Sequence, residues 1–361
     1  MSENDVQHSG VNELNANYIR IFVPRLKYYM LMQHTLLTSR ALLFSLAAVV
    51  WCSCESPIEV EDIFEPKVVV QSSYLPGQAT RVYVSVSRPN DADEGTPYPP
   101  NAVVHLQQVG SQVSEQLAFV SATGTRQAHY LSQSTVIAGG ETYRLKVSVP
   151  GFEPVVAHSY VPRASEITDV SVEEVDKRGI EDGSICTFRL DFSINLDPQI
   201  DETQYFYFEP QVNYSLWEQM GDDTVIIDTE TYGVRVNPDR PAQFERFGNG
   251  FMFRSSDFEV IDNKLSLRFF LEAPSFTYTD GRVSGRFPHG VDMVLLTLSD
   301  DFYHFYTSIN RQNQNNPLSS DYSFLTPIQL SGPRPVFIYN NVEGGLGSVA
   351  GFNFYTTQAS L

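Results

Sequence analysis

Apolar and polar residues alternate with a period of two along much of the chain between residue 67 and about residue 161. The alternation is clearest where Tyr143, Leu145, Val147 and Val149 are separated by polar residues. A period of two places every second side chain on the same face of a β-strand. Glycine and proline residues separate the alternating stretches, so we expect a series of short strands, each with one face in a core.

The region 66–161 has the size and pattern of one β-sandwich domain. A Gly-x-x-Tyr-x-Leu-x-Val run, closely followed by Pro150 and Gly151, is typical of the penultimate strand of immunoglobulin-like and fibronectin-like sandwiches, in which a tyrosine corner is common. About 95 residues in roughly seven short strands also suit that fold. We therefore predict an N-terminal immunoglobulin-like β-sandwich, with another all-β sandwich of different connections as the alternative.

A second, larger β-rich domain is predicted over residues 167–361, after a linker at residues 162–166. Its strands are longer and more aromatic, and Cys186, Phe188 and Leu190 alternate strictly with other residues. This pattern places Cys186 in a core, where a free thiol behaves as a small hydrophobic group. We expect a structural role for this cysteine.

One helix is predicted directly after residue 298. Ser299 is a suitable N-cap, and Asp300 and Asp301 would stand in the first turn, at the positive end of the helix dipole. The apolar residues that follow at helical spacing are Phe302, Phe305, Tyr306 and Ile309. We expect this aromatic stripe to pack on a sheet and not to bind a ligand.

The segment before residue 54 has the pattern of an export signal. Arg40 precedes an apolar run over residues 41–52. The run is too short to cross a bilayer, which needs roughly 20 apolar residues, but it suits the apolar core of a signal peptide. Ser53 and Cys54 resemble the lipobox of bacterial lipoproteins, which implies a diacylglycerol on the Cys54 thiol. Cys52 is the rival anchor, and a buried helix with an incidental cysteine is the alternative.

Residues 1–29 do not resemble an export signal, because they place acidic residues ahead of the apolar run. Met30 or Met32 therefore competes with Met1 as the start of the protein. We assign residues 1–53 to an N-terminal extension and lipoprotein signal peptide and residues 54–65 to an acidic tether.

The charge of the chain limits its partners. It has 43 acidic and 24 basic residues, which gives a net charge of -19. This balance argues against a nucleic-acid-binding protein, because affinity for phosphate backbones depends on clustered Lys and Arg. An acidic body is also repelled by anionic headgroups, so acyl chains alone would hold it at a membrane.

No active-site motif is present in the sequence. It lacks a Gly-x-Ser-x-Gly elbow, a His-Glu-x-x-His pair, a phosphate loop and a Cys-x-x-Cys pair. Three cysteines are too few for a disulfide scaffold or a four-thiolate zinc site. The glycines at 344–347 are interpreted as a turn. We expect a non-enzymatic protein with no catalytic residue, no metal site and no cofactor.

Aromatic residues are the one feature that suggests a binding surface. Residues 205–208 place rings on both faces of their strand, and further rings follow at 244–253. A ring on the solvent side of a sandwich can stack on a sugar or cover a partner protein. Burial of both faces is the alternative. The candidate ligand-facing residues are Tyr205, Tyr207, Phe251 and Phe253.

Three segments carry a resemblance to a known family. They are residues 66–77 (PKVVVQSSYLPG), 140–147 (GETYRLKV) and 341–347 (NVEGGLG). They resemble a Bacteroidota lipoprotein family known only as a domain of unknown function (4249), over nearly the whole chain after Cys54. The resemblance implies an N-terminal sandwich and an outer-membrane lipoprotein encoded near a TonB-dependent receptor, and it assigns no catalytic residues.

Two functions from different classes are compatible with these features. The first is a non-enzymatic, lipid-anchored accessory protein of a TonB-dependent receptor or a surface assembly, on the periplasmic or the surface-facing side of the outer membrane. The second is a surface glycan- or peptide-binding lipoprotein that uses exposed aromatic residues.

Overall fold

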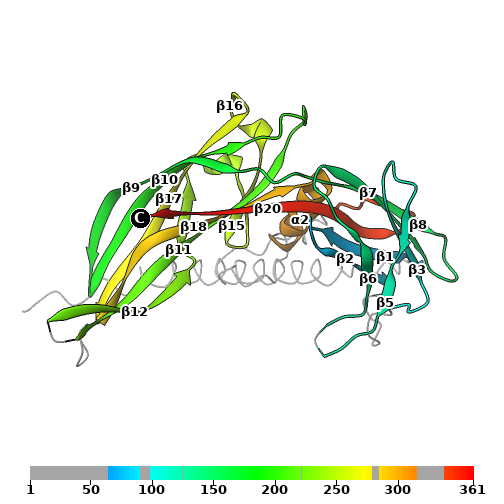
Figure 1. The fold of residues 1–361 in the computed structure, drawn as a ribbon, viewed down its shortest axis with the longest axis horizontal. Coiled ribbons are helices and arrows are strands. Elements are labelled where there is room, and N and C mark those ends of the chain that lie inside the picture. Colours follow the sequence, from blue (N-terminus) through cyan, green and yellow to red (C-terminus); the bar gives the residue numbers. More distant parts are fainter. Residues whose placement is uncertain (1–63, 90–97, 125, 221, 279–283, 315–336) are drawn as a thin grey trace, which may run out of the picture. The chain divides into compact units, whose positions relative to one another are not determined.

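The computed structural model describes residues 64–89, 98–124, 126–220, 222–278, 284–314 and 337–361. Residues 64–361 form one compact unit, and its described part is all-β apart from one α-helix and two short 3-10 helices (Figure 1). The predicted fold class is confirmed. The predicted anchor Cys54, the apolar run before it and nearly all of the tether lie outside the described residues.

The first part of the unit is a sandwich of two sheets. Its strands are β1 (Val68–Tyr74), β2 (Ala79–Val86), β3 (Val103–Gln108), β4 (Ser114–Gln116), β5 (Ala118–Val120), β6 (His129–Val136), β7 (Glu141–Ser148), β8 (Val155–Val161), β19 (Val342–Glu343) and β20 (Leu346–Ser360). One sheet has the order β20–β1–β2–β6–β5 and the other has the order β19–β8–β7–β3–β4. Val82, Leu106 and Leu145 belong to the hydrophobic cluster between them.

The strand with the clearest alternation is β7. Tyr143, Leu145 and Val147 are buried, whereas Arg144 and Lys146 are exposed. The hydroxyl of Tyr143 accepts a hydrogen bond of 2.8 Å from the backbone N–H of Ala138. A hydrogen bond between this hydroxyl and the backbone a few residues earlier is the arrangement of a tyrosine corner. The predicted inward face is therefore confirmed.

The second part packs two layers of longer strands against each other. Its elements are β9 (Ile167–Ile180), β10 (Gly183–Asn195), β11 (Tyr205–Met220), β12 (Asp223–Tyr232), β13 (Arg235–Pro238), η1 (Pro241–Gln243), β14 (Glu245–Phe247), β15 (Gly250–Arg254), η2 (Ser255–Asp257), β16 (Val260–Ile261), β17 (Lys264–Tyr278), β18 (Ser284–Leu298) and α2 (Asp300–Gln314). β9, β10 and β17 form one layer, and β12, β11, β18 and β20 form the other. Cys186 is buried in the cluster between the layers, as predicted.

Strand β20 joins the two parts. Residues 346–351 pair in parallel with β1, and residues 352–360 pair in antiparallel with β18. The approach to β1 requires Gly347, whose φ is 121° and where an added Cβ would lie 1.9 Å from the carbonyl oxygen of Val70. One sheet therefore runs from the sandwich into the second part.

The route of β20 differs from the domain boundaries that the sequence suggested. Strand β19 and residues 346–351 of β20 fall in the range assigned to the second domain, 167–361, yet β19 pairs with β8 and this part of β20 pairs with β1, both in the sandwich. Alternation shows which side chains of a strand share a face, but it does not show which strand lies next to it. The return of the chain to the sandwich was for this reason not visible in the sequence.

Helix α2 begins where the sequence predicts. The Oγ of Ser299 accepts a hydrogen bond of 3.1 Å from the backbone N–H of Phe302, as an N-cap does. The same oxygen accepts a bond of 3.1 Å from the N–H of Gly351 in β20. The helix packs on the side of β11 and β18 that points away from the core between the layers, where Leu298 and Met252 are buried. No helix in the described ranges is long and apolar enough to cross a membrane.

Candidate binding groove beside helix α2

Two of the four aromatic residues predicted to face a ligand lie in the core. Phe251 is 5% exposed and Phe253 is 1% exposed. The Phe253 ring lies 5.4 Å from that of Phe206 on the neighbouring strand β11. The prediction for these two residues was wrong, because β15 turns them between the two layers and places Met252 on its other face.

Tyr205 and Tyr207 point to the opposite face but do not form an open platform. The Tyr205 ring lies 4.7 Å from that of Tyr303 on α2. Burial, reinforced by the Asp300 carboxylate, raises the pKa of Tyr205 to about 12. The Tyr207 hydroxyl donates a hydrogen bond of 2.6 Å to Glu209. The helix covers this face of β11, so the sequence-based prediction of a solvent-facing platform is corrected here as well.

A groove lies on the other side of α2, over the sandwich part of the same continuous sheet. Its volume is about 470 Å³. Strands β1, β2 and β20 form its floor, and α2 forms one wall. We call it the α2 groove, and its lining residues include Gln71, Ser73, Arg81, Tyr83, Phe305 and Ser348.

The floor of the α2 groove carries a row of polar side chains, one from each of three adjacent strands, which we call the polar rung. The register pairs Gln71 with Tyr83 on β2 and with Ser348 on β20. Along β1, Val68, Val70 and Ser72 are buried while Gln71 and Ser73 are exposed, so the rung faces away from the sandwich core. The ring of Tyr83 also lies 5.7 Å from that of His129 on β6. Side chains that can donate, accept and stack therefore stand side by side.

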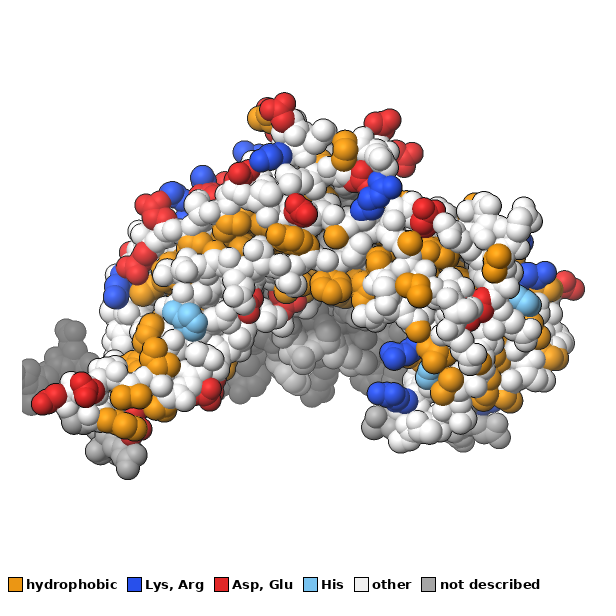
Figure 2. All heavy atoms as spheres, viewed as in Figure 1, with side chains coloured by type: hydrophobic (Ala, Val, Ile, Leu, Met, Phe, Trp, Pro, Cys, Tyr) orange, Lys and Arg blue, Asp and Glu red, His pale blue; other side chains and the backbone are white. Residues whose placement is uncertain are grey.

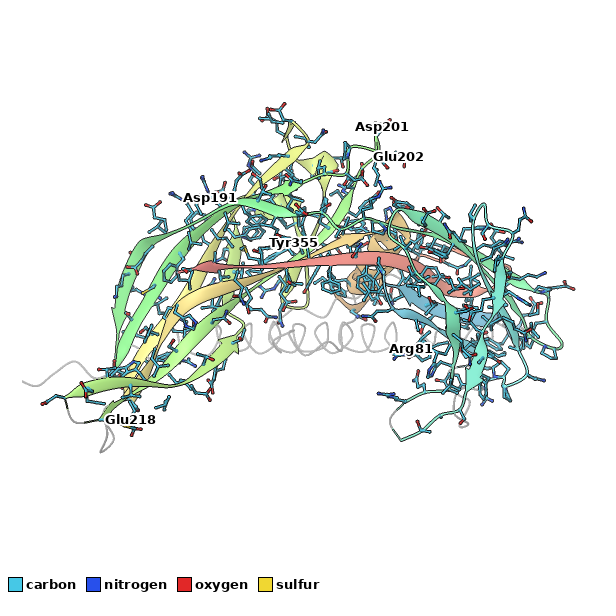
Figure 3. All side chains as sticks on the ribbon, in the orientation of Figure 1. Arg81, Asp191, Asp201, Glu202, Glu218 and Tyr355 are labelled. Atoms are coloured by element: carbon cyan, nitrogen blue, oxygen red, sulfur yellow. The ribbon has the colours of Figure 1, made fainter. Side chains whose placement is uncertain are left out.

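Arg81 stands beside this rung, two residues before Tyr83 on β2. Its side chain is exposed, and Figure 3 shows it projecting from the sheet. Within the described part of the chain, no carboxylate forms an ion pair with its guanidinium group. The groove thus presents one cation in a strongly acidic protein.

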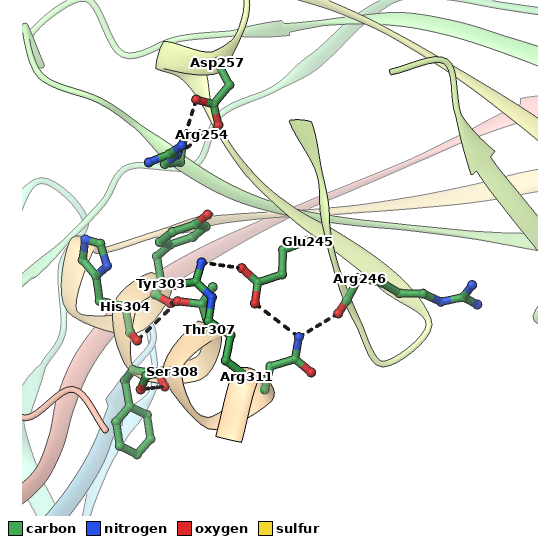
Figure 4. A network of polar contacts seen from close by, with 11 residues as sticks. Glu245, Arg246, Arg254, Asp257, Tyr303, His304, Thr307, Ser308 and Arg311 are labelled. Atoms are coloured by element: carbon green, nitrogen blue, oxygen red, sulfur yellow. Dashed lines mark hydrogen bonds and ion pairs between the residues drawn. The ribbon is translucent and has the colours of Figure 1, made fainter. Parts of the chain in front are cut away.

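The wall formed by α2 is held in place from its far side. Arg311 donates a hydrogen bond of 3.1 Å to Glu245, and Asn310 donates one of 3.0 Å to the backbone carbonyl of Arg246 (Figure 4). At the first turn, Asp301 accepts a bond of 2.8 Å from the Tyr339 hydroxyl. These contacts fix the helix to β14 and to the segment before β19. Phe305 and Ile309 are left to line the groove.

A second hollow, of about 790 Å³, lies over β10 and β17. Charged side chains line it, and several of them are already paired. Lys264 Nζ lies 2.7 Å from Asp169, and Arg268 Nε lies 2.6 Å from Asp191, whose position is shown in Figure 3. A ligand would have to compete with these ion pairs, so the α2 groove is the better candidate for binding.

The structure places a serine beside a histidine, a pairing that the sequence did not suggest. Ser215 Oγ lies 3.0 Å from Nδ1 of His289. Ser215 is buried, however, and no carboxylate hydrogen-bonds to this imidazole in the described residues, whereas an activated serine needs an oriented base and access for a substrate. Burial also raises the pKa of the Cys186 thiol, which disfavours the reactive thiolate.

Clusters of three or more metal-ligating side chains are absent from the described residues. Asp300 and His304 lie 3.1 Å apart on one side of α2, as the helical spacing implies, without a third ligand. The α2 groove offers side chains that can form hydrogen bonds, stack and carry charge.

Comparison with known proteins identifies the family but no function. No curated protein matches the chain. Residues 55–358 match the family described as Domain of unknown function (DUF4249), which confirms the resemblance found in the segments at 66–77, 140–147 and 341–347. Because this match covers most of the chain, the protein belongs to the DUF4249 family.

Proposed function

We propose that this protein is a non-enzymatic, lipid-anchored accessory protein of the cell envelope. It is attached to the outer membrane through Cys54 and binds a partner protein, a TonB-dependent receptor or a surface assembly of the same membrane. The choice of a TonB-dependent receptor as the partner rests on the family resemblance. The observation that supports protein binding is the exposed edge of the second part of the fold.

That edge is strand β12. Among the described strands it pairs only with β11, so the backbone N–H and C=O groups on its other side pair with no described strand. Its centre is apolar, and Val225, Ile226 and Ile227 are 39%, 57% and 54% exposed. An open apolar edge is a template for the addition of a strand from another chain. Exposure of these apolar side chains does not stabilise a monomer, so it supports the binding of a partner protein at this edge.

The charge around the edge indicates what the partner segment is like. Asp223, Asp228 and Glu230 belong to the same strand, and Figure 2 shows hydrophobic and acidic side chains mixed over the end of the β11–β12 hairpin. An extended segment with an apolar centre and flanking basic residues would match both features. Anchoring both proteins in one membrane raises their effective concentration, so a modest contact is sufficient.

Photo-crosslinking in the cells that make the protein tests this proposal. A crosslinker at Ile226 is expected to capture the receptor, and Ile226→Lys with Ile227→Lys should lower its copurification by about tenfold or more, since a charge would be desolvated at the contact. The matched control is Val175→Lys, which changes an exposed valine on the edge strand β9. Equal receptor recovery with both variants would exclude β12 as the contact.

The anchor is tested separately. Cys54→Ala should abolish lipid labelling and release the protein from membranes, whereas Cys52→Ala should retain both. Labelling that persists in Cys54→Ala and disappears in Cys52→Ala would move the anchor to Cys52.

A further inference from the structure

We propose that the α2 groove binds a carbohydrate that carries a carboxylate, such as an oligosaccharide of uronic acids. Arg81 binds the carboxylate, and Phe305 stacks on a sugar ring. The hydroxyl groups of the ligand form hydrogen bonds with the polar rung, which consists of Gln71, Tyr83 and Ser348. The inference is independent of the partner contact at β12, because it concerns the other end of the fold.

Ser348 is the first observation that indicates a ligand. It is 5% exposed, it lines the groove, and its Oγ has no hydrogen-bond partner among the described residues. A buried hydroxyl without a partner is destabilising, and such groups are rare in folded proteins. A ligand hydroxyl in the groove would supply the missing partner, because it can donate a hydrogen bond to this oxygen or accept one from it.

Arg81 defines the charge of the ligand. Its guanidinium group is exposed beside the rung and has no carboxylate partner in the described part of the chain. A guanidinium forms paired, charge-assisted hydrogen bonds with a carboxylate. Since Gln71 and Tyr83 are the neighbouring groups on the floor, the same ligand must also present groups for neutral hydrogen bonds.

The backbone of the floor favours a carbohydrate over a peptide. β1 is paired on both sides, with β2 and β20, and β2 is paired on both sides, with β1 and β6. β20 pairs with β1 on one side, and on its other side the backbone groups of Val349 and Gly351 bond with Asn341 and Ser299. An extended peptide therefore finds no free strand edge here and cannot bind by β-augmentation. Recognition must come from side chains, and amide, hydroxyl and aromatic groups suit the hydroxyl-rich edges and apolar faces of sugar rings.

Calorimetry of the purified full chain tests the assignment. The probe is a short oligogalacturonate, and the comparison ligand is a neutral galacto-oligosaccharide of the same length. We expect the acidic ligand to bind, and Arg81→Gln to weaken its binding by about tenfold or more, as the loss of a charged hydrogen bond implies. Arg144→Gln, which removes an exposed arginine from β7 in the opposite sheet, should leave the affinity unchanged.

Ser348→Ala separates a loss of affinity from a loss of folding stability. The substitution removes a hydroxyl that has no partner in the described structure, so the free energy of unfolding should stay the same or rise, while the affinity for oligogalacturonate falls several-fold. The proposal is overturned if oligogalacturonate does not bind at millimolar concentration, or if Arg81→Gln binds it as tightly as Arg144→Gln. A polyglutamate peptide that displaces the sugar at equal concentration would instead assign the groove to acidic peptides.

Discussion

The outer face of one continuous sheet is covered by a helix in one region and open to solvent in another. In the second part, the face of β11, β18 and β20 is covered by α2, which packs on Tyr205, Leu298 and Phe352. In the sandwich, the face of β1 and β2 beside the same helix stays open as the α2 groove. The covered residues are mainly apolar, and the open ones include Gln71, Ser73 and Arg81.

The difference follows from the cost of closing a helix over each surface. Covering apolar side chains is favourable by about 25 cal/mol per Å². Covering an amide or a guanidinium that lacks a partner is unfavourable by several kcal/mol. The helix therefore lies on the aromatic face and stops at the polar one. In this protein the density of aromatic residues marks the covered face, and the polar rung marks the open one.

The largest expected loss of stability follows from disrupting the pairing of β1 with β20, which joins the two faces into one sheet and which we call the seam. Gly347→Ala places a Cβ 1.9 Å from the Val70 carbonyl oxygen at a φ of 121°. The close pairing of β1 with β20 would have to open, and we expect more than about 4 kcal/mol of destabilisation. Urea unfolding measures the loss. Gly233→Ala, a site with nothing within 4 Å of the added Cβ, is the control, and equal midpoints for the two variants would contradict the seam.

A second pair of variants compares a covered ring with an open one. Phe253 is 1% exposed in the core between the layers, so Phe253→Ala should cost about 3–5 kcal/mol in unfolding free energy. Tyr83 lies in the open groove, and Tyr83→Ala should cost less than about 1 kcal/mol. Similar losses would show that the groove floor is packed as tightly as the core, which would remove the distinction between the two faces.

The sequence predicts which side chains share a face, and most of the correct predictions of buried residues follow from this pattern. Tyr143, Leu145 and Cys186 lie in the cores that alternation implied, and Ser299 caps the helix. Residues 205–208 show the limit of the method. Alternation showed that both faces of this strand carry rings, but the element that covers the second face is α2, about 95 residues later. No local pattern records that contact.

The α2 groove was missed for a related reason. Gln71, Tyr83 and Ser348 come from three strands, and the parallel pairing of β1 with β20 brings the last of them to the other two. Each is an ordinary outward residue within its own strand. The one local signal was the isolated Arg81 in an acidic chain, and it could not indicate Ser348. Binding residues that gather only through long-range pairing cannot be inferred from periodicity.

A third prediction concerns acid stability, which we expect to be controlled in the sandwich by Glu115. Its carboxylate accepts hydrogen bonds from the backbone N–H groups of Gln133, Ser134 and Thr135 at 2.6, 2.9 and 2.7 Å. Burial alone would raise its pKa, but these bonds and one from the Thr135 side chain lower it to about 2. Because the folded value lies below the ordinary 4.5, the stabilisation is present above that pH and is lost as the pH falls toward 2.

Glu115→Gln should therefore cost about 1–2 kcal/mol at neutral pH, a modest figure because the group is partly exposed to solvent. The cost should shrink in acid, when the wild-type carboxylate is protonated. Urea unfolding at neutral pH and near the lower pKa measures both values, with the exposed Glu153→Gln as the control. A loss that stays constant with pH would mean that the charge of Glu115 is not responsible.

The smallest effect is expected at the residue that sets where the covering helix begins. Ser299 Oγ accepts hydrogen bonds from the N–H groups of Phe302 and Gly351, both at 3.1 Å, so it fixes the first turn of α2 to β20. Ser299→Ala should cost about 1 kcal/mol, the usual value of an N-cap. Ser299→Asp retains an acceptor and should recover part of the stability. Since Phe305 lies on the same helix, Ser299→Ala should also weaken oligogalacturonate binding slightly if α2 is a wall of the groove. An unchanged affinity together with the expected loss of stability would show that the helix covers the aromatic face without shaping the open one.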